Sequence, residues 1–430
     1  MGNFECVMSV TLVLGATWGD EGKGKVVDFL SQNAHFVIRF NGGNNAGHTV
    51  VNKYGTFAMH LIPSGIFHKR AVSFITNGVV LDIEVLSEEL KNLEKAGIKT
   101  KNRFFISPRC HIIMPYHKLL DKAYEEAKED KKTGTTGRGI GPVFADKVSY
   151  NGIRLFDLLD KTVFVEKLQT QLKIKNKILQ SFGIFPLSQK DIIPTYLKLL
   201  EKIKPFIIEP YPFIQKAIQN KKNILLEGAQ GVMLDTDWGT YPFVTASTIV
   251  SGGINHQAGI PPQQLKTIIG VAKAYTTRVG SGPFPTELLN SEGEKLRVAG
   301  NEFGTTTGRP RRCGWFDAEV LRFVKEVNGL TSLAITKIDI LDSFKTIKIC
   351  TGYTYKGKKI RYFQTDANLL AKVTPLYKTL EGWQTDTKGI TKYNDLPRLA
   401  KQFIKEIEKQ VAIPVSYIST GQKTSEIITV

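Results

Sequence analysis

A strand, a glycine-rich loop and the start of a helix follow one another near the beginning of the chain. Residues 9–14 are apolar and β-rich, residues 19–25 have the spacing G-x-x-x-x-G-K, and the apolar run from Val26 is typical of a helix start. Such a loop directs backbone N–H groups at phosphate oxygens, and the helix adds the positive end of its dipole. This order predicts an α/β protein with a P-loop-like phosphate site.

The same alternation continues along the chain. Short apolar runs at residues 35–40, 223–228, 268–275 and 333–339 each lead into a polar or glycine-rich loop. Helical periodicity covers residues 84–96, 117–131 and a last helix near 395–410. We therefore predict a central, mostly parallel sheet flanked by helices, with ligands bound at the carboxyl ends of its strands.

No internal repeat or linker divides the chain, so we expect one large domain. It should cover residues 9–430 and include a helical excursion at about residues 160–222, broken near Pro186, Pro194 and Pro205. Residues 1–8 are interpreted as an N-terminal extension, because Met8 could serve as an alternative start.

The phosphate loop departs from a standard P-loop in two ways. Lys25 is followed by Val26, where a P-loop carries the Ser or Thr that binds Mg²⁺. Two acids, Asp20 and Glu21, lie inside the loop, and acids beside phosphate are expected only where they bind metal or move protons. The simpler alternative is a turn with solvated charges, which the preceding strand and following helix make less favourable.

A second motif, residues 336–339 with the sequence TKID, ends a predicted strand. The carboxylate of Asp339 can accept hydrogen bonds from N1–H and N2–H₂ of guanine, a donor pair that adenine lacks. A strand end with two solvated charges is the alternative. Together with the phosphate loop, the motif predicts a GTP site.

Two further loops carry polar groups suited to an anionic ligand. His48 lies among small and amide residues at 44–49, and histidine can donate to phosphate or act as an acid. Residues 304–308 place glycines around three threonines, and arginines follow at 309, 311 and 312. Arginine pairs bidentately with carboxylates and phosphates, although a solvated basic loop remains the alternative.

The formal net charge of +18 fits either small anionic substrates or simply solvated lysine-rich faces. Nucleic-acid binding is not supported, because the chain has no arginine-rich tract or aromatic RNA-binding motif. No apolar run is long enough for a membrane span. The four cysteines are scattered and form no CxxC pair, which suits a reducing cytoplasm better than zinc or disulfides.

The chain resembles the adenylosuccinate synthetase family from residue 9 to its C-terminus. The matching motifs are WGDEGKGK (18–25), GGNNAGHT (42–49), HLIPSG (60–65), GTTGRGIGP (134–142), EGAQG (227–231), GTYPFVTAS (239–247), GNEFGTTTGRPRR (300–312), TKID (336–339) and ISTG (418–421). Nine matches in order make chance implausible.

The resemblance implies that IMP is joined to L-aspartate while GTP is cleaved to GDP and phosphate, in de novo AMP biosynthesis. O6 of IMP is phosphorylated first, and aspartate then displaces the phosphate. Asp20 would take the N1 proton of IMP and bind Mg²⁺ together with the carbonyl of Gly47. His48 and Lys23 would stabilise the transferring phosphoryl group.

The resemblance also implies the binding residues. The catalytic residues are expected to be Asp20, Lys23, His48 and Gln230. Contacts to GTP are expected from Gly19, Asp20, Glu21, Gly22, Lys23, Gly24, Lys25, Gly47, His48, Thr49, Arg311, Lys337, Ile338, Asp339, Ser419, Thr420 and Gly421. Contacts to IMP are expected from Asp20, Glu21, Gly22, Lys23, Asn45, Ala46, Gly47, His48, Thr136, Gln230, Thr245 and Arg309. Contacts to L-aspartate are expected from Thr305, Thr306, Thr307, Gly308, Arg309, Pro310 and Arg311. The metal ligands are expected to be Asp20 and Gly47.

One position departs from the family pattern. The family has an arginine shortly after the DKV segment that reaches across a dimer to the 5′-phosphate of IMP, whereas this chain has Tyr150 there. A phenol donates one hydrogen bond and supplies no charge. Either Lys147 or Arg154 compensates, or IMP binds less tightly, or the contact is dispensed with.

Three other functions fit the sequence less well. A viral-type relative that uses a deoxyguanosine monophosphate substrate lacks the catalytic aspartate, which is present here as Asp20. A regulatory GTP-binding protein without ligase activity would need a Ser or Thr after Lys25. A nucleic-acid-binding protein would show a steep salt dependence. We expect GTP, IMP, L-aspartate and Mg²⁺ as ligands, a cytoplasmic homodimer, and no nucleic-acid or membrane partner.

Overall fold

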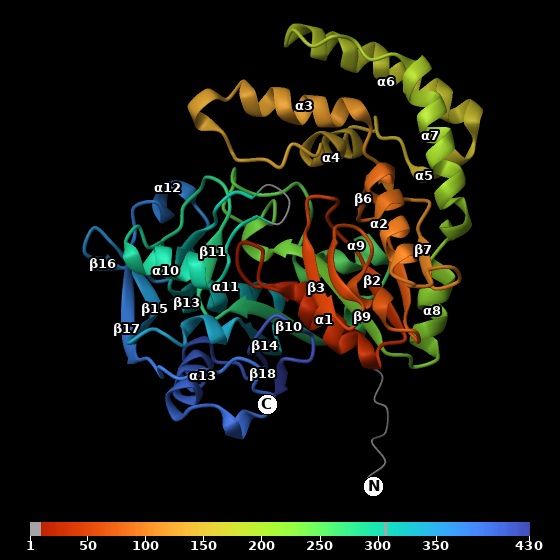
Figure 1. Cartoon of the computed structure of the whole chain (residues 1–430). Coiled ribbons are helices and arrows are strands. Elements are labelled where there is room, and N and C mark those ends of the chain that lie inside the picture. The colour runs from red at the N-terminus through yellow and green to blue at the C-terminus, as the bar shows by residue number, and fades with distance from the viewer. Residues whose placement is uncertain (1–9, 305–307) are drawn as a thin grey trace.

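The computed structural model describes residues 10–304 and 308–430. Its centre is a nine-stranded sheet with the order β19-β18-β14-β10-β1-β9-β2-β5-β7, in which only β19 runs antiparallel to its neighbour (Figure 1). The strands of this sheet are β1 (Val10–Gly15), β2 (Phe36–Arg39), β5 (Val72–Ile75), β7 (Phe104–Ile106), β9 (Ile224–Gly231), β10 (Leu265–Lys273), β14 (Ser332–Thr336), β18 (Val415–Ser419) and β19 (Ile427–Thr429). The predicted α/β fold with a mostly parallel sheet is confirmed.

The central strands are buried on both faces, which explains their continuous apolar sequences. All residues of β14 are buried, and in β1 only Thr11 is partly exposed. Helices that cover both faces of a parallel sheet require such uniformly apolar strands, because neither face meets water. The predicted extension at residues 1–8 lies outside the described residues.

Helices surround the sheet, and α3, α4 and α6 form a lobe above it in Figure 1. The helices are α1 (Lys23–Leu30), α2 (Ile83–Lys95), α3 (Pro115–Glu126), α4 (Ile140–Val148), α5 (Leu155–Leu159), α6 (Lys161–Ser181), α7 (Gln189–Ile203), α8 (Tyr211–Gln219), α9 (Ile254–Ala258), α10 (Ser291–Ala299), α11 (Ala318–Asn328), α12 (Ala367–Leu370) and α13 (Arg398–Val411). None of the helices in the described part of the chain is long and apolar enough to span a membrane.

The expected helical excursion at about residues 160–222 is present as α6 to α8, but one predicted break is wrong. Pro194 lies inside α7 rather than ending it. The proline removes one backbone hydrogen bond, yet Ile192, Tyr196, Leu200 and Ile203 bury one continuous face of the helix. This packing outweighs the local cost and keeps α7 whole.

Several short strand pairings outside the central sheet were not predicted. The largest joins β15 (Thr346–Tyr355) to β17 (Thr374–Glu381), with β16 (Lys358–Lys359) and β13 (Phe316–Asp317) also pairing with β15. The remaining pairs are β3 (His48–Asn52) with β4 (Gly55–Met59), β6 (Val80–Leu81) with β8 (His111–Ile112), and β11 (Thr276–Arg278) with β12 (Arg312–Gly314). Among these pairings, β6 with β8 and β13 with β15 are parallel, and the others are antiparallel.

The strand order places the loops with the predicted binding motifs at one edge of the sheet. Strand β1 lies between β9 and β10, and β14 and β18 follow β10. Because these strands are parallel, the loops after them emerge side by side at their carboxyl ends. The predicted phosphate loop, the TKID motif and the ISTG motif are therefore neighbours.

Candidate functional site

The predicted phosphate loop connects β1 to α1 through a strongly curved backbone. Gly19 and Gly22 have φ angles of 92° and 88°, and Asp20, which is not a glycine, has a φ of 61°. The loop packs so closely on the end of β9 that a Cβ at Gly231 would lie 2.3 Å from the carbonyl oxygen of Thr17. Both the curvature and the close packing depend on glycine.

Glu21 faces into this loop rather than out of it. Its buried Oε1 accepts hydrogen bonds from the backbone N–H of Thr17 at 3.1 Å and of Gly19 at 2.8 Å, and Lys23 Nζ lies 2.7 Å from Oε2. Burial raises the pKa of Glu21, but Lys23 and the backbone donors outweigh burial and leave the pKa below its ordinary value. The side chain of Glu21 is thus an internal support, and its predicted GTP and IMP contacts remain predictions.

Asp20 is placed quite differently. Its side chain is 31% exposed, and its Oδ2 lies 2.8 Å from Nε of Arg311. Left-handed backbone is uncommon for an aspartate, and such conformations concentrate at functional sites. One of the two acids therefore builds the loop, and the other is presented at its surface next to a predicted aspartate-binding arginine.

The predicted phosphate lysine, Lys25, is fully engaged by the C-terminal segment. Its Nζ donates to Ser419 Oγ and to the carbonyl of Gly421, both at 2.8 Å, and to the carbonyl of Glu426 at 2.9 Å. Burial lowers the pKa of Lys25 to about 8. Lys25 thus ties the predicted guanine segment 419–421 to α1, and its direct phosphate contact remains a prediction.

The TKID motif touches the phosphate loop. Thr336 Oγ1 donates to the carbonyl of Glu21 at 2.6 Å, and Lys337 has a left-handed φ of 59°. Asp339 Oδ1 is buried and has no hydrogen-bond partner within the described part of the chain. Burial also raises the pKa of Asp339. The Ile338 side chain is fully buried, so only its backbone could face a ligand.

His48 is held by a buried carboxylate. Its Nδ1 contacts Glu227, which also accepts from the backbone N–H of Ser64 at 2.8 Å and lies 3.6 Å from Arg39. Burial lowers the pKa of His48. Burial raises the pKa of Glu227, but His48 and Arg39 outweigh burial and lower it. His48 Nε2 is buried without a partner among residues 10–304 and 308–430, so it is the ring atom left for a ligand.

Three predicted IMP residues form one hydrogen-bonded set, which we name the Gln230 group: Gln230, Asn45 and Thr245. Gln230 Nε2 donates to Asn45 Oδ1 at 2.9 Å, and Asn45 Nδ2 donates to Thr245 Oγ1 at 3.2 Å. Gln230 also has a left-handed φ of 57°. The structure therefore brings together residues 45, 230 and 245. Thr136 is exposed, and Ala46 is buried.

The remaining predicted site residues differ in their exposure to solvent. Gly47, Thr49, Arg309 and Pro310 are exposed, whereas Gly24 and Thr420 are buried. A Cβ at Gly24 would lie 2.8 Å from that of His48, so glycine lets α1 approach His48 closely. Gly308 has a φ of 63°. Thr305, Thr306 and Thr307 lie outside the described residues.

Two of the three arginines after this loop, Arg311 and Arg312, have different surroundings. Arg311 pairs with Asp20, and Arg312 donates to Glu287 Oε1 at 2.7 Å and to the carbonyl of Gly282 at 2.8 Å. Arg312 is therefore part of the local structure. The sequence alone did not distinguish the two.

Two acids that the sequence analysis left without a role prove central. Glu227 holds His48, and Glu302 contacts both Arg311 and Lys337. Lys273 is another charged residue without a predicted role, and its Nζ donates to Glu302 Oε1 at 2.8 Å. For Glu227 and Lys273 a signal existed, because each is a charge that directly follows an apolar run, residues 224–226 and 268–272, and a buried charge needs a partner.

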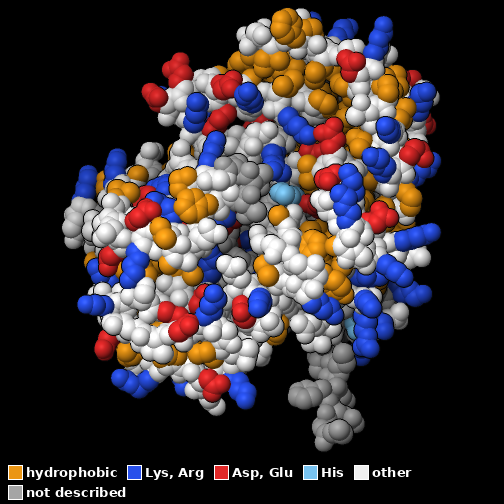
Figure 2. Space-filling model, viewed as in Figure 1, with side chains coloured by type: hydrophobic (Ala, Val, Ile, Leu, Met, Phe, Trp, Pro, Cys, Tyr) orange, Lys and Arg blue, Asp and Glu red, His pale blue; other side chains and the backbone are white. Residues whose placement is uncertain are grey.

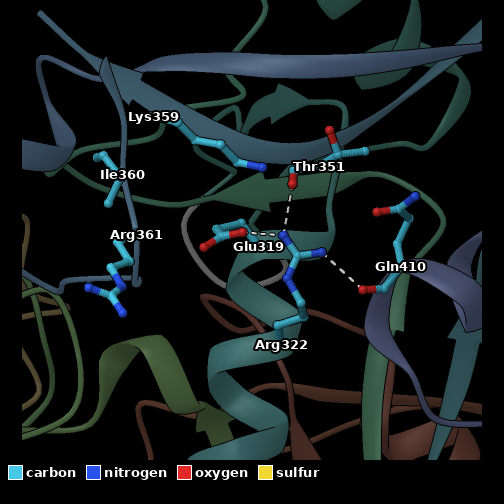
Figure 3. Close-up of a pocket in the computed structure, with 7 residues that line it drawn as sticks. All are labelled: Glu319, Arg322, Thr351, Lys359, Ile360, Arg361 and Gln410. Carbon is cyan, nitrogen blue, oxygen red and sulfur yellow. Dashed lines mark hydrogen bonds and ion pairs between the residues drawn. The ribbon is translucent and has the colours of Figure 1, made fainter.

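The described residues contain no cluster of three or more His, Cys, Asp or Glu side chains that could hold a metal. Figure 2 shows a face hollowed near its centre, with Lys and Arg side chains spread over it. A cavity of about 380 Å³ near α11 and β15 contains none of the predicted site residues (Figure 3). Its Arg322 is occupied by Glu319 and by the carbonyls of Thr351 and Gln410.

Comparison with known proteins is consistent along the whole chain. The family model for adenylosuccinate synthetase matches residues 12–428. The adenylosuccinate synthetase of Carboxydothermus hydrogenoformans is 49% identical over 98% of this chain and 99% of its own length. That of Geobacter metallireducens is 48% identical over the same shares.

Two solved structures are also similar. Fully ligated adenylosuccinate synthetase from Plasmodium falciparum has a TM-score of 0.93 and 35% identity, covering 98% of this chain and 100% of the other. Succinoaminodeoxyadenylate synthetase of cyanophage S-2L, bound to dGMP and dATP, has a TM-score of 0.60 and 16% identity over 98% of this chain and 95% of its own. The second likeness concerns the fold alone.

Proposed function

The chain belongs to the adenylosuccinate synthetase family, a family of GTP-dependent ligases of AMP biosynthesis, and from this premise we propose how its own residues carry out the reaction. IMP and L-aspartate are joined to adenylosuccinate through a 6-phosphoryl-IMP intermediate, and GDP and phosphate are released. The alternative of a regulatory GTP-binding protein without ligase activity is not favoured.

The observation that carries the proposal is the buried, unpartnered Oδ1 of Asp339 beside the phosphate loop. A buried carboxylate oxygen without a donor is costly, so it indicates a ligand that brings one. The N1–H and N2–H₂ groups of guanine are such donors. Lys337 and the segment Ser419 to Gly421 would complete the base pocket, while Gly19 to Lys25 would hold the phosphates.

Asp20 is the proposed general base. It would accept the N1 proton of IMP, so that O6 attacks the γ-phosphorus of GTP and the bond to the β-phosphate oxygen breaks. The amino group of L-aspartate then attacks C6 and expels the phosphate. The Gln230 group, with Ala46, Thr136 and Arg309, would hold IMP, and residues 305–311 would hold L-aspartate.

His48 and Lys23 are proposed to stabilise the charge of the transferring phosphoryl group. Glu227 holds Nδ1 of His48, which leaves Nε2 as the atom that can donate to a phosphoryl oxygen once it is protonated. The negative charge of bound phosphates favours that protonated form, opposing the effect of burial on its pKa.

A divalent metal is expected for a GTP-using enzyme, and we propose Mg²⁺ held by Asp20 and the carbonyl of Gly47. The residues fit, because Asp20 is partly exposed and the space above Gly47 is open. One carboxylate suffices, since Mg²⁺ takes most of its other ligands from substrate phosphates and water. When bound, Mg²⁺ would neutralise developing charge on the phosphates. Arg311 pairs with Oδ2 of Asp20, so the metal and Arg311 would share this carboxylate.

We further propose a cytoplasmic homodimer. Val148, the last residue of α4, and Tyr150, just beyond the helix, are 72% and 97% exposed, as expected for residues that a second subunit covers. The described cysteines Cys110, Cys313 and Cys350 are free thiols, which suits a reducing compartment. Small molecules rather than nucleic acid or membranes are the proposed partners.

Tyr150→Arg is expected to lower the KM for IMP by roughly three- to ten-fold, because a guanidinium adds a charge-assisted contact to the 5′-phosphate. Steady-state kinetics with IMP as the varied substrate measures the change. The KM for GTP should stay the same. An unchanged KM for IMP would show that Lys147, Arg154 or other groups already supply the charge.

Purified protein with IMP, L-aspartate, GTP and Mg²⁺ is expected to form adenylosuccinate. ATP should substitute poorly, because adenine offers no donor pair to Asp339. Removing the metal with EDTA should stop the reaction, and added Mg²⁺ should restore it. If no adenylosuccinate forms in the complete mixture, the proposed function is wrong.

A further inference from the structure

Five polar side chains meet next to the proposed site, and we name them the Glu302 cluster: Lys273, Tyr275, Glu302, Arg311 and Lys337. Glu302 is fully buried at their centre. Its Oε1 accepts from Lys273 Nζ at 2.8 Å, from Lys337 Nζ at 2.6 Å and from the Tyr275 hydroxyl at 2.5 Å. Its Oε2 accepts from Arg311 Nη1 at 2.7 Å. These donors occupy the full capacity of one carboxylate.

The negative charge of Glu302 is what allows three cations to lie together. Burial raises the pKa of Glu302, but Lys273, Lys337 and Arg311 outweigh burial and hold the pKa well below its ordinary value. Glu302 is therefore ionised at neutral pH. If it were neutral, the three cations would repel one another at short range in a poorly solvated setting, with Asp20 and Asp339 as the nearby counter-ions.

Two members of the cluster, Lys337 and Arg311, also belong to the proposed ligand sites. Lys337 lies two positions before Asp339 and also donates to the carbonyl of Gly300 at 2.7 Å. Nε of Arg311 lies 2.8 Å from Oδ2 of Asp20. Lys337 follows β14 and Arg311 precedes β12, so these segments are far apart in sequence. Glu302 is the carboxylate that both share.

Lys273, in contrast, does not belong to either proposed ligand site. It is the last residue of β10, pairs with Thr336 in the sheet and is almost fully buried. Its ammonium donates to Glu302 and, at 2.7 Å, to Thr277 Oγ1. Burial lowers the pKa of Lys273 to about 8. A buried cation with these partners acts through Glu302 and not on a substrate.

We infer that the Glu302 cluster is a positioning unit that couples the guanine pocket to the L-aspartate site. Glu302 holds Lys337 beside the base and Arg311 beside Asp20, and Lys273 fixes Glu302 in place. This inference rests on the proposed function. It implies that disturbing Glu302 affects GTP and L-aspartate together, whereas IMP, held mainly by the separate Gln230 group, is affected little.

The test compares steady-state kinetics of the wild type, Glu302→Gln, Lys273→Met and the control Glu287→Gln. Glu302→Gln is expected to raise the KM for GTP and for L-aspartate by roughly ten-fold each, with the KM for IMP within about two-fold of the wild type. Lys273→Met should also raise the KM for GTP and for L-aspartate and leave the KM for IMP nearly unchanged, but the increases should be smaller. Glu287 is a matched control, because it pairs with the neighbouring Arg312 and contacts neither Lys337 nor Asp20.

A loss of kcat with unchanged KM values, or an equal rise for all three substrates, would overturn the inference. If Glu302→Gln does not fold, Lys273→Met decides, because Glu302 keeps Lys337 and Arg311 as cationic partners when the ammonium of Lys273 is removed. Unchanged KM values for GTP and L-aspartate in Lys273→Met would then refute the coupling.

A wild type that forms no adenylosuccinate would refute the proposed function but not the cluster. GTP binding measured by calorimetry then tests the cluster without turnover. Glu302→Gln should bind GTP roughly ten-fold more weakly than the wild type, with Glu287→Gln unchanged. Equal affinity of Glu302→Gln and wild type would overturn the inference.

Discussion

Asp20→Asn is expected to reduce adenylosuccinate formation by about 10³-fold or more while GTP still binds. An amide cannot accept the N1 proton of IMP, and general base catalysis alone contributes about 10²–10⁴-fold. The amide is also a weaker ligand for Mg²⁺ than a carboxylate. Turnover and GTP binding are measured separately, by product formation and by calorimetry.

The structure sharpens this prediction through the second acid of the loop. Glu21 is buried and bonded to the loop backbone, so its replacement should distort the loop, whereas Asp20 is partly exposed and bonded mainly to Arg311. Asp20→Asn should therefore leave the fold intact. Asp237→Asn, at an exposed aspartate after β9, serves as the control and should keep the wild-type rate. Retained turnover in Asp20→Asn would refute the role as base.

Asp339→Asn is expected to change which nucleotide the protein accepts. With GTP, kcat/KM should fall by roughly 10²–10³-fold, because the amide N–H₂ faces the N2–H₂ donor of guanine and can accept nothing from it. Xanthine has an oxygen at the position of N2, and the same amide can donate to it. XTP should therefore be used better than GTP by the variant, and worse than GTP by the wild type.

The comparison of nucleotides contains its own control. The three nucleotides carry the same triphosphate and are tested on the same protein, so only the base differs. Kinetics with GTP, XTP and ATP as the varied substrate would measure it. If Asp339→Asn lowers activity with all three nucleotides by the same factor, the residue supports the structure rather than reading the base. The buried, unpartnered Oδ1 argues for base reading.

Local spacing in the sequence predicted the parts of the site that depend on short segments. The glycines at 19 and 22 permit the curved loop, and TKID follows a strand whose residues are all buried. The parallel sheet then brings these loops together, which the alternation of strands and helices was enough to predict. For this reason Asp20, His48 and Asp339 are candidates from the sequence, and their roles stay predictions.

The roles of several charged residues could not be predicted, because their partners are distant in sequence. Lys25 matches a phosphate lysine by spacing, yet its ammonium is bonded to Ser419 and Gly421. Glu302 lay within a recognised motif without an assigned role, since its partners Lys273, at the end of β10, and Lys337, just after β14, are distant in sequence. Local patterns do not encode such contacts. The same reason explains Pro194, where tertiary packing outweighs a local helix signal.

The central claim is that this site activates O6 of IMP with the γ-phosphate of GTP. The most direct measurement uses IMP labelled with ¹⁸O at position 6, together with L-aspartate, unlabelled GTP and Mg²⁺. The account predicts that adenylosuccinate forms and that the ¹⁸O is recovered in the inorganic phosphate, because O6 leaves C6 still bound to phosphorus. Inorganic phosphate without ¹⁸O, formed in step with adenylosuccinate, would contradict the account.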